Sequence, residues 1–134
     1  NNHIRLMHDY CKHGSLIVAF DFDNTVFDYH KNGSTYPKVV ELLREVKALG
    51  WPLILFTARE KGERIIEAVS YCRDIGLYSN QNFYVNRSPV MQGTAKPYYN
   101  ILLDDRAGLK EAYNLLSNII KQIKDGKQHT TLNG

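Results

Sequence analysis

Four short apolar runs, separated by amphipathic stretches, constrain the fold of this chain most strongly. The first covers residues 16–22, reads Leu-Ile-Val-Ala-Phe-Asp-Phe and is followed by Asp23. Three similar runs cover residues 51–57, 82–86 and 100–104. Short continuous apolar runs are typical of strands that are buried on both faces of a parallel sheet. We therefore expect four strands at these positions.

The stretches between the runs have apolar residues at helical spacing. Helices are predicted over residues 4–13, 37–49, 61–75 and 108–124. Pro37 suits the first turn of a helix, and Gly50 and Gly76 suit the positions just after a helix ends. Alternating strands and helices indicate an α/β fold, a Rossmann-like three-layer sandwich with a mainly parallel sheet.

The chain length of 134 residues fits a single domain over 1–134. The last ten residues, 125–134, are polar, and we expect them to form a loose tail. Residues 27–36 contain Asn32-Gly33, a strong hairpin signal. A small β-hairpin flap is therefore predicted after the first strand.

Polar residues follow three of the four predicted strands at the point where each ends. They lie at residues 21–23, 57–59 and 104–105. In parallel sheets, ligands bind beyond the carboxyl ends of the strands. One pair of acids at a strand end is often only a solvated surface feature, but three polar strand ends together indicate a functional site.

These segments resemble sequence motifs of the haloacid dehalogenase superfamily. Asp-Phe-Asp-Asn-Thr-Val at 21–26 resembles its first motif, Leu-Phe-Thr-Ala-Arg at 55–59 its second, and Leu-Asp-Asp-Arg at 103–106 its fourth. The three occur in the expected order. Within the superfamily, the chain resembles 5′(3′)-deoxyribonucleotidases and the phosphatase domain of bacteriophage polynucleotide kinase. The resemblance implies a Mg²⁺-dependent phosphatase.

The resemblance also implies a role for each matching residue. Asp21 would attack phosphorus and form an aspartyl-phosphate, and Asp23 would act as the general acid. Thr57 would donate a hydrogen bond to the phosphoryl group, with Ala58 and Arg59 beside it. Mg²⁺ would be held by Asp21, the backbone carbonyl of Asp23, Asp104 and Asp105, the last directly or through water. Carboxylates and carbonyls are the oxygen ligands that Mg²⁺ prefers.

The lysine of the third motif is matched less closely. Lys96, in Thr-Ala-Lys-Pro, is the candidate for this lysine, and we expect it to bind the phosphate and to act in catalysis. It lies eight positions before Asp104, so it precedes the strand whose far end carries the acids. Arg59, Arg87 and Arg106 follow strand ends and are the alternatives for this role.

Neither loop between the strands is long enough to hold a separate cap domain, so the resemblance is to capless members. An open site suits bulky substrates such as nucleic-acid ends, or a second subunit that acts as a lid. We therefore expect a phosphomonoesterase acting on a nucleotide or polynucleotide phosphate. The alternatives are a sugar-phosphate or other small-molecule phosphatase, and a non-catalytic module that accepts phosphate or binds a ligand.

Composition limits the cellular context. The net charge of +3 permits an anionic substrate without requiring nucleic acid. No apolar run approaches the roughly 20 residues of a membrane-spanning helix, so no membrane partner is expected. The two cysteines, Cys11 and Cys72, form no metal-ligand pattern. They favour a reducing compartment, and we expect a cytoplasmic protein.

Overall fold

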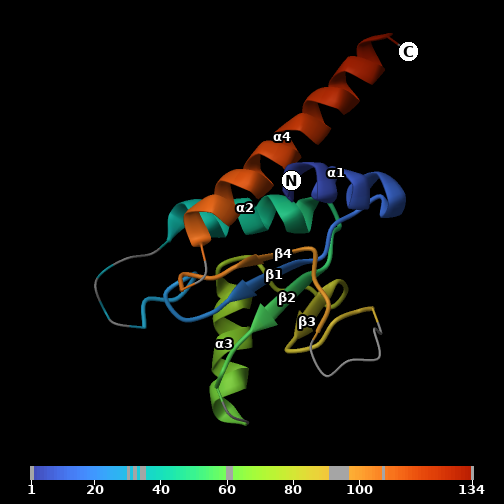
Figure 1. Cartoon of the computed structure of the whole chain (residues 1–134). Coiled ribbons are helices and arrows are strands. Elements are labelled where there is room, and N and C mark those ends of the chain that lie inside the picture. The colour runs from blue at the N-terminus through green and yellow to red at the C-terminus, as the bar shows by residue number, and fades with distance from the viewer. Residues whose placement is uncertain are drawn as a thin grey trace.

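The elements alternate along the chain as the sequence predicts (Figure 1). The computed structural model describes residues 2–29, 31, 33, 36–59, 62–90, 97–106 and 108–133, and only the backbone over 127–133. Its elements are α1 (Asn2–His13), β1 (Val18–Asp21), α2 (Pro37–Ala48), β2 (Leu53–Phe56), α3 (Glu63–Asp74), β3 (Phe83–Val85), β4 (Ile101–Leu103) and α4 (Leu109–Asn133). The strands are shorter than predicted by two or three residues, and the residues lost from β3 and β4 are polar.

The four strands form one all-parallel sheet in the order β3-β2-β1-β4. The predicted α/β class and parallel sheet are confirmed. The first strand is central, with β2 on one side and the last strand, β4, on the other. Asp21 pairs with Phe56 of β2, and Phe20 pairs with Leu103 of β4. This register brings Asp21 and Asp104 to the same level at the carboxyl end of the sheet.

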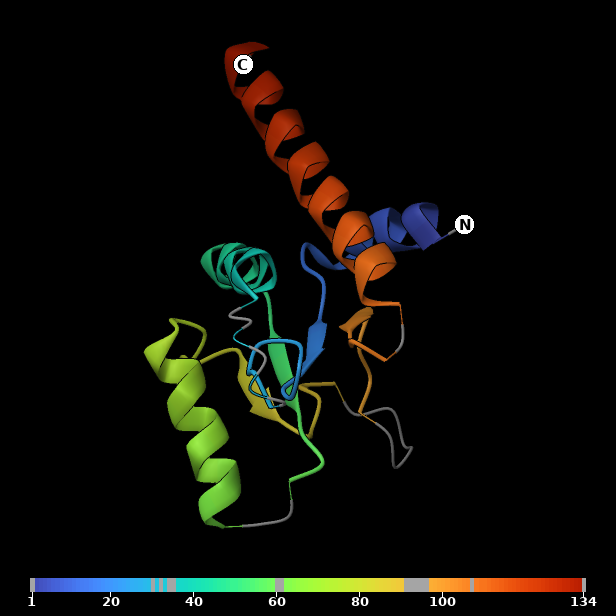
Figure 2. The ribbon, with the colours of Figure 1, turned by 90° about the vertical axis from the view of Figure 1, so that its left-hand side faces the viewer.

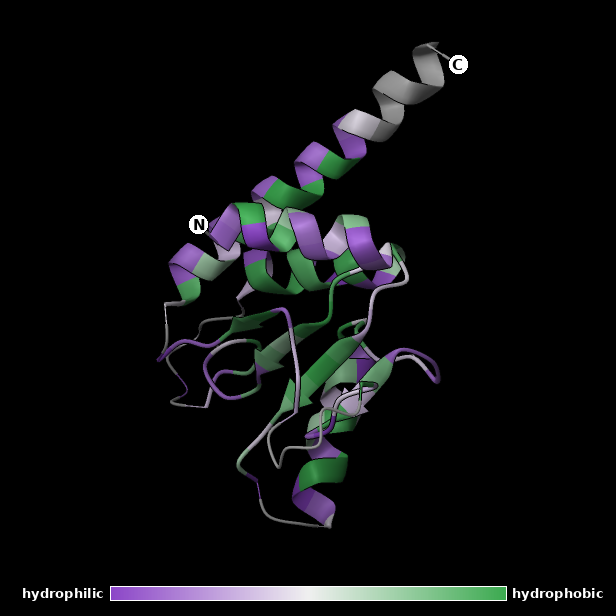
Figure 3. Cartoon of the chain, turned by 45° about the vertical axis from the view of Figure 1, so that its right-hand side comes forward, coloured by the Kyte–Doolittle hydropathy of each residue, from purple (hydrophilic) through white to green (hydrophobic). Residues whose placement is uncertain are grey.

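One face of the sheet carries the main core. Phe20, Leu55 and Leu103 of the strands are fully buried there, together with side chains from all four helices. The helices alternate apolar and polar residues along their length, whereas the strands are largely apolar (Figure 3). Burial of each large apolar side chain contributes about 1.5–3 kcal/mol, which makes this cluster the main source of stability.

A smaller apolar cluster lies on the opposite face of the sheet. Ile17, Ala19 and Ile54 are buried there against Tyr98, Tyr99 and other partly buried side chains. No helical residue belongs to this cluster among the described residues. The helices pack on the face that carries the main core, and Tyr98 and Tyr99 from the segment before β4 pack on the opposite face. Figure 2 shows α2 and α3 together on one side of the sheet.

The predicted β-hairpin flap does not form in the described part of residues 27–36, where no strand is present. Each end of this segment makes contacts outside a hairpin. Phe27 packs on Phe22 in the core, and Tyr36 adopts a left-handed conformation directly before α2. Gly33 donates its backbone N–H to the Asp28 carboxylate over 2.6 Å, closing a loop instead. Asn32 of the predicted turn lies outside the described residues.

The segment predicted as a loose tail is helical in the structure, and its looseness stays a prediction. Helix α4 continues to Asn133 and projects beyond the rest of the molecule (Figures 1 and 2). Extending an existing helix adds one hydrogen bond for each residue ordered, so a polar continuation of a packed helix forms readily. In the part of the chain described by the structure, no helix has the length and apolar composition needed to cross a membrane.

Candidate functional site

Acidic side chains from two neighbouring strands meet at the carboxyl end of the sheet. Asp21 ends β1, and Asp104 and Asp105 directly follow β4. One carboxylate oxygen from each of the three lies within 4.8 Å of the others. The sequence placed all three in one site, and the structure brings them together. Three carboxylates at this separation could hold a metal ion.

The electrostatics of the cluster support a cation at this position. The pKa of Asp21 is raised from 3.8 to about 6, first by burial and then by Asp104, Asp105 and Asp23. The pKa of Asp105 is also raised, by burial and by the neighbouring Asp104. Carboxylates that repel each other in a partly desolvated site are stabilised by a bound divalent ion. The residues present therefore fit a hard cation with oxygen ligands.

Backbone turns hold the acids after β4. Thr25, which is completely buried, accepts a hydrogen bond from the Asp105 backbone N–H over 3.2 Å. Asp104 accepts one from the Arg106 backbone N–H over 3.0 Å. The turn after β1 is thereby tied to the turn after β4. Sequence analysis did not single out Thr25, although it belongs to the first motif.

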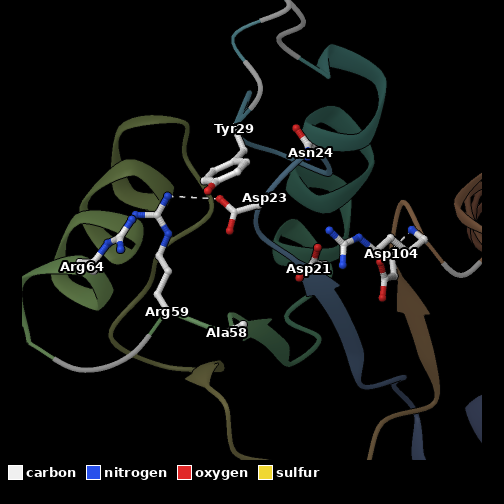
Figure 4. A pocket seen from close by; sticks show the side chains of 9 residues that line it. Asp21, Asp23, Asn24, Tyr29, Ala58, Arg59, Arg64 and Asp104 are labelled. Carbon is white, nitrogen blue, oxygen red and sulfur yellow. Dashed lines mark hydrogen bonds and ion pairs between the residues drawn. The ribbon is translucent and has the colours of Figure 1, made fainter.

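Asp23 does not join the carboxylate cluster. The chain leaves the sheet after Asp21, and a tight turn over residues 22–27 begins, with Asn24 in a left-handed conformation. Asparagine tolerates this conformation better than most residues. Asp23 turns toward Arg59, whose guanidinium donates to the Asp23 carboxylate over 3.2 Å (Figure 4). The predicted metal contact of Asp23 was through its backbone carbonyl, and that contact stays a prediction.

Arg59 is held in a narrow slot. Its side chain is 11% exposed, and its guanidinium lies 4.9 Å from the ring centre of Phe22 and 5.4 Å from that of Phe27. Glu67 of α3 approaches it to 3.8 Å. Its Nε is buried without a hydrogen-bond partner among the described residues. The guanidinium therefore has a fixed position beside Asp23.

Thr57 lies just beyond β2 and is almost fully buried. Its hydroxyl oxygen accepts a hydrogen bond from the Arg59 backbone N–H over 3.1 Å, so the hydroxyl hydrogen can still be donated. Asn86, at the end of β3, accepts from the Thr57 backbone N–H over 3.0 Å and donates to its carbonyl over 3.1 Å. Asn86 was missed by sequence reasoning, although an asparagine directly after a strand was visible.

A cleft of about 410 Å³ lies over these strand ends (Figure 4). Its lining mixes acids and arginines: Asp21, Asp23, Asn24, Tyr29, Ala58, Arg59, Arg64, Asp104 and Arg106. Five predicted site residues, Asp21, Asp23, Ala58, Arg59 and Asp104, thus line one cleft. Asn24 and Arg64 are additions by the structure. Tyr29 follows the first motif, where the sequence allows it either to touch a leaving group or to cover the site.

Lys96 and Arg87 are two of the basic residues that the sequence offers for binding the phosphate. Lys96 lies outside the described residues, so its role stays a prediction. Arg87 stacks over Tyr84, 5.2 Å from the ring centre, and does not line the cleft. Arg106, the other alternative, does line it.

Comparison with known proteins relates the chain to a solved structure, whose description names no activity. No protein-family model matches the chain, and no curated protein matches it. A solved structure of a conserved protein from Bacteroides thetaiotaomicron superposes with a TM-score of 0.62 and 31% sequence identity, covering 81% of this chain and 91% of that chain. The chain belongs to the same family as this conserved Bacteroides protein. The relationship agrees with the α/β fold described above.

Proposed function

We propose that this protein is a Mg²⁺-dependent phosphomonoesterase of the haloacid dehalogenase type, which acts through an aspartyl-phosphate on Asp21. The observation that carries the proposal is the meeting of the Asp21, Asp104 and Asp105 carboxylates at the carboxyl end of the sheet, where Asp21, Asp104 and Asp23 line one cleft. The motif resemblance supplies the reaction type. The proposed substrate is a nucleotide or polynucleotide phosphate, for which the support is the resemblance and the arginine-rich cleft.

The first half of the reaction needs a nucleophile and an acid. Asp21 attacks phosphorus, the bond from phosphorus to the leaving oxygen breaks, and Asp23 gives that oxygen a proton. In the second half, water attacks the aspartyl-phosphate while Asp23 takes a proton from it, which releases phosphate and restores Asp21. Positioned proton transfer is typically worth about 10²–10⁴-fold in rate.

The surrounding residues position these groups. Arg59 fixes the Asp23 carboxylate, and the Thr57 hydroxyl has a hydrogen to donate to a phosphoryl oxygen. Asp21, Asp104 and Asp105 would hold Mg²⁺, which when bound offsets the repulsion between the nucleophile and the phosphate. Lys96 remains the predicted third-motif lysine.

The test is a panel of phosphate monoesters with and without Mg²⁺. The panel includes 3′- and 5′-phosphorylated nucleotides and oligonucleotides, sugar phosphates and an aryl phosphate. We expect Mg²⁺-dependent release of phosphate and an acid-stable phosphoenzyme, both abolished in Asp21→Asn. Asp74→Asn, at the end of α3 and outside the cleft, is the matched control and should retain activity.

Two outcomes would contradict the proposal. Equal activity of Asp21→Asn would show that another residue attacks phosphorus. If the metal-replete wild type hydrolyses no ester of the panel, the non-catalytic module becomes the better interpretation.

A further inference from the structure

The arginines of the cleft differ in how their charge is compensated. Arg59 is buried and paired with Asp23, and Glu67 adds a second negative charge 3.8 Å away. Its charge is therefore balanced within the protein. Arg64, the second residue of α3, also lines the cleft but is exposed.

Arg64 makes no ion pair or side-chain hydrogen bond with another described residue. Glu67, one turn further along α3, is close enough to pair with it in a helix but contacts Arg59 instead. Among the residues that the structure describes, no carboxylate pairs with the positive charge of Arg64. Such a charge is suited to an anion supplied by a ligand.

The position of Arg64 relative to Asp21 and Asp23 indicates which part of a bound substrate it would contact. Figure 4 shows Arg64 on the same side as Asp23 and Arg59, with Tyr29 beside Asp23, while Asp21 and Asp104 lie on the other side. In the proposed reaction, Asp21 bonds to phosphorus and Asp23 protonates the leaving oxygen. The leaving group therefore extends toward Arg64 and Tyr29.

We propose that Arg64 forms a subsite for a second anionic group, carried by the leaving group of the substrate. This inference rests on the proposed function for its direction across the cleft. It selects esters such as nucleoside bisphosphates or phosphorylated oligonucleotides, whose leaving group bears a phosphate or phosphodiester. Nucleoside monophosphates release a neutral alcohol and gain nothing from Arg64. The Tyr29 ring, 53% exposed on the same side, offers an aromatic face to a base.

The test compares a nucleoside 3′,5′-bisphosphate with the matching 3′- and 5′-monophosphates. We expect kcat/KM of the wild type to favour the bisphosphate by about five- to tenfold, which is the scale of one partly exposed charge-assisted contact. Arg64→Gln should bring this ratio close to one. Arg73→Gln, on the same helix but packed over Tyr78 away from the cleft, should keep the wild-type ratio.

Fructose 1,6-bisphosphate and fructose 6-phosphate form a second arm. A preference for both bisphosphates that depends on Arg64 assigns the subsite to a phosphate group on any leaving group. A preference confined to the nucleotide pair assigns it to nucleotides. A wild-type ratio near one, or a ratio unchanged by Arg64→Gln, would overturn the subsite.

Equilibrium binding separates this inference from the proposed function. If no ester is hydrolysed, the phosphatase proposal fails, while calorimetric titration of the same bisphosphate and monophosphates still measures the subsite. We then expect tighter binding of the bisphosphate, with the difference lost in Arg64→Gln. Equal dissociation constants would refute the subsite independently of turnover.

Discussion

At the scale of single residues, the two acids of the first motif have different environments. Asp21 lies in a cluster of like charges, whereas Asp23 is paired with an arginine held between two aromatic rings. Only Phe22 separates them in sequence, yet the turn after β1 sends them to different parts of the cleft. This separation allows one to attack and the other to transfer protons.

Replacing Asp23 with asparagine tests this division of labour. Asp23→Asn should slow phosphoenzyme formation from a sugar or nucleoside ester by about 10²–10⁴-fold, because the alkoxide departs without a proton. An aryl ester needs less help, so its first step should be less affected. In the second step the attacking water has no base in this variant, so hydrolysis of the phosphoenzyme is slow and the phosphoenzyme should accumulate. Rapid-quench kinetics with both esters should show a burst with the aryl ester alone.

Equal loss of the first step for both esters, without a burst, would contradict the general-acid role. Asp23 would then only position the loop. Asp28→Asn provides a control on the same connection, because Asp28 caps a loop amide and does not line the cleft.

At the scale of elements, Asn100 joins α1 to the strands. Its side-chain oxygen accepts the Ile17 backbone N–H over 2.6 Å, and its amide nitrogen donates to Asp9 of α1 and to the Tyr98 hydroxyl, each over 3.2 Å. Only 6% of the residue is exposed. The starts of β1 and β4 are thereby fixed to each other and to the first helix.

Truncating this side chain should destabilise the fold. Asn100→Ala leaves the buried Ile17 N–H without its partner, and we expect a loss of about 1–3 kcal/mol in the free energy of unfolding. Urea denaturation monitored by circular dichroism measures it. Asn80→Ala is the control, because Asn80 is exposed and only accepts a hydrogen bond from Tyr78. A comparable loss in both variants would contradict the bridging role of Asn100.

The elements could be predicted from the sequence because apolar periodicity is a local property. Continuous apolar runs mark the strands, and their polar ends place Asp21 and Asp104 at the same edge once the sheet is parallel. The predicted hairpin has no strand in the described residues, and Phe27 packs on Tyr71 of α3 as well as on Phe22, a contact with α3 that local sequence does not specify. The length of α4 was missed because polarity indicates exposure as readily as disorder.

The contacts within the site could be predicted only in part. The carboxylate cluster follows from the positions of the acids at the carboxyl ends of parallel strands. The pairing of Arg59 with Asp23, and of Asn86 with Thr57, joins positions that are far apart in the chain and depends on side-chain directions. Nothing in the spacing of these residues specifies which partner each one takes.

At the scale of the whole molecule, the acidic cluster links stability to pH and to metal. The folded-state pKa of Asp21, about 6, lies above its value of 3.8 in an unfolded chain. The folded state therefore holds its proton more tightly, and stability falls as pH rises from about 4 to about 6. The shift corresponds to about 3 kcal/mol at most. Because Asp21 is partly exposed, we expect solvent screening to reduce this to about 1 kcal/mol.

Asp21→Asn should remove this dependence. In the absence of metal at pH 7.5, the variant should be about 1 kcal/mol more stable than the wild type, and the difference should shrink at pH 4. Mg²⁺ at 100 times its dissociation constant should stabilise the wild type by about 2.7 kcal/mol and the variant less. Urea titrations with chelator or with Mg²⁺ at the two pH values measure both effects. Identical pH profiles for the two proteins would contradict this account of the cluster.

The place of β1 between β2 and β4 has a consequence for synthesis on the ribosome. Asp21 emerges before α2 and β2, whereas Asp104 directly follows β4, which is made after them and pairs on the other side of β1. Since chains emerge from the N-terminus at about 5–20 residues per second, a nascent chain carries Asp21 for several seconds without its two acidic neighbours. During this interval the helices α2 and α3 can pack on β1 and β2 free of the repulsion that the finished cluster creates. The repulsion among these carboxylates thus arises only after the strands and helices that hold Asp21 have been made.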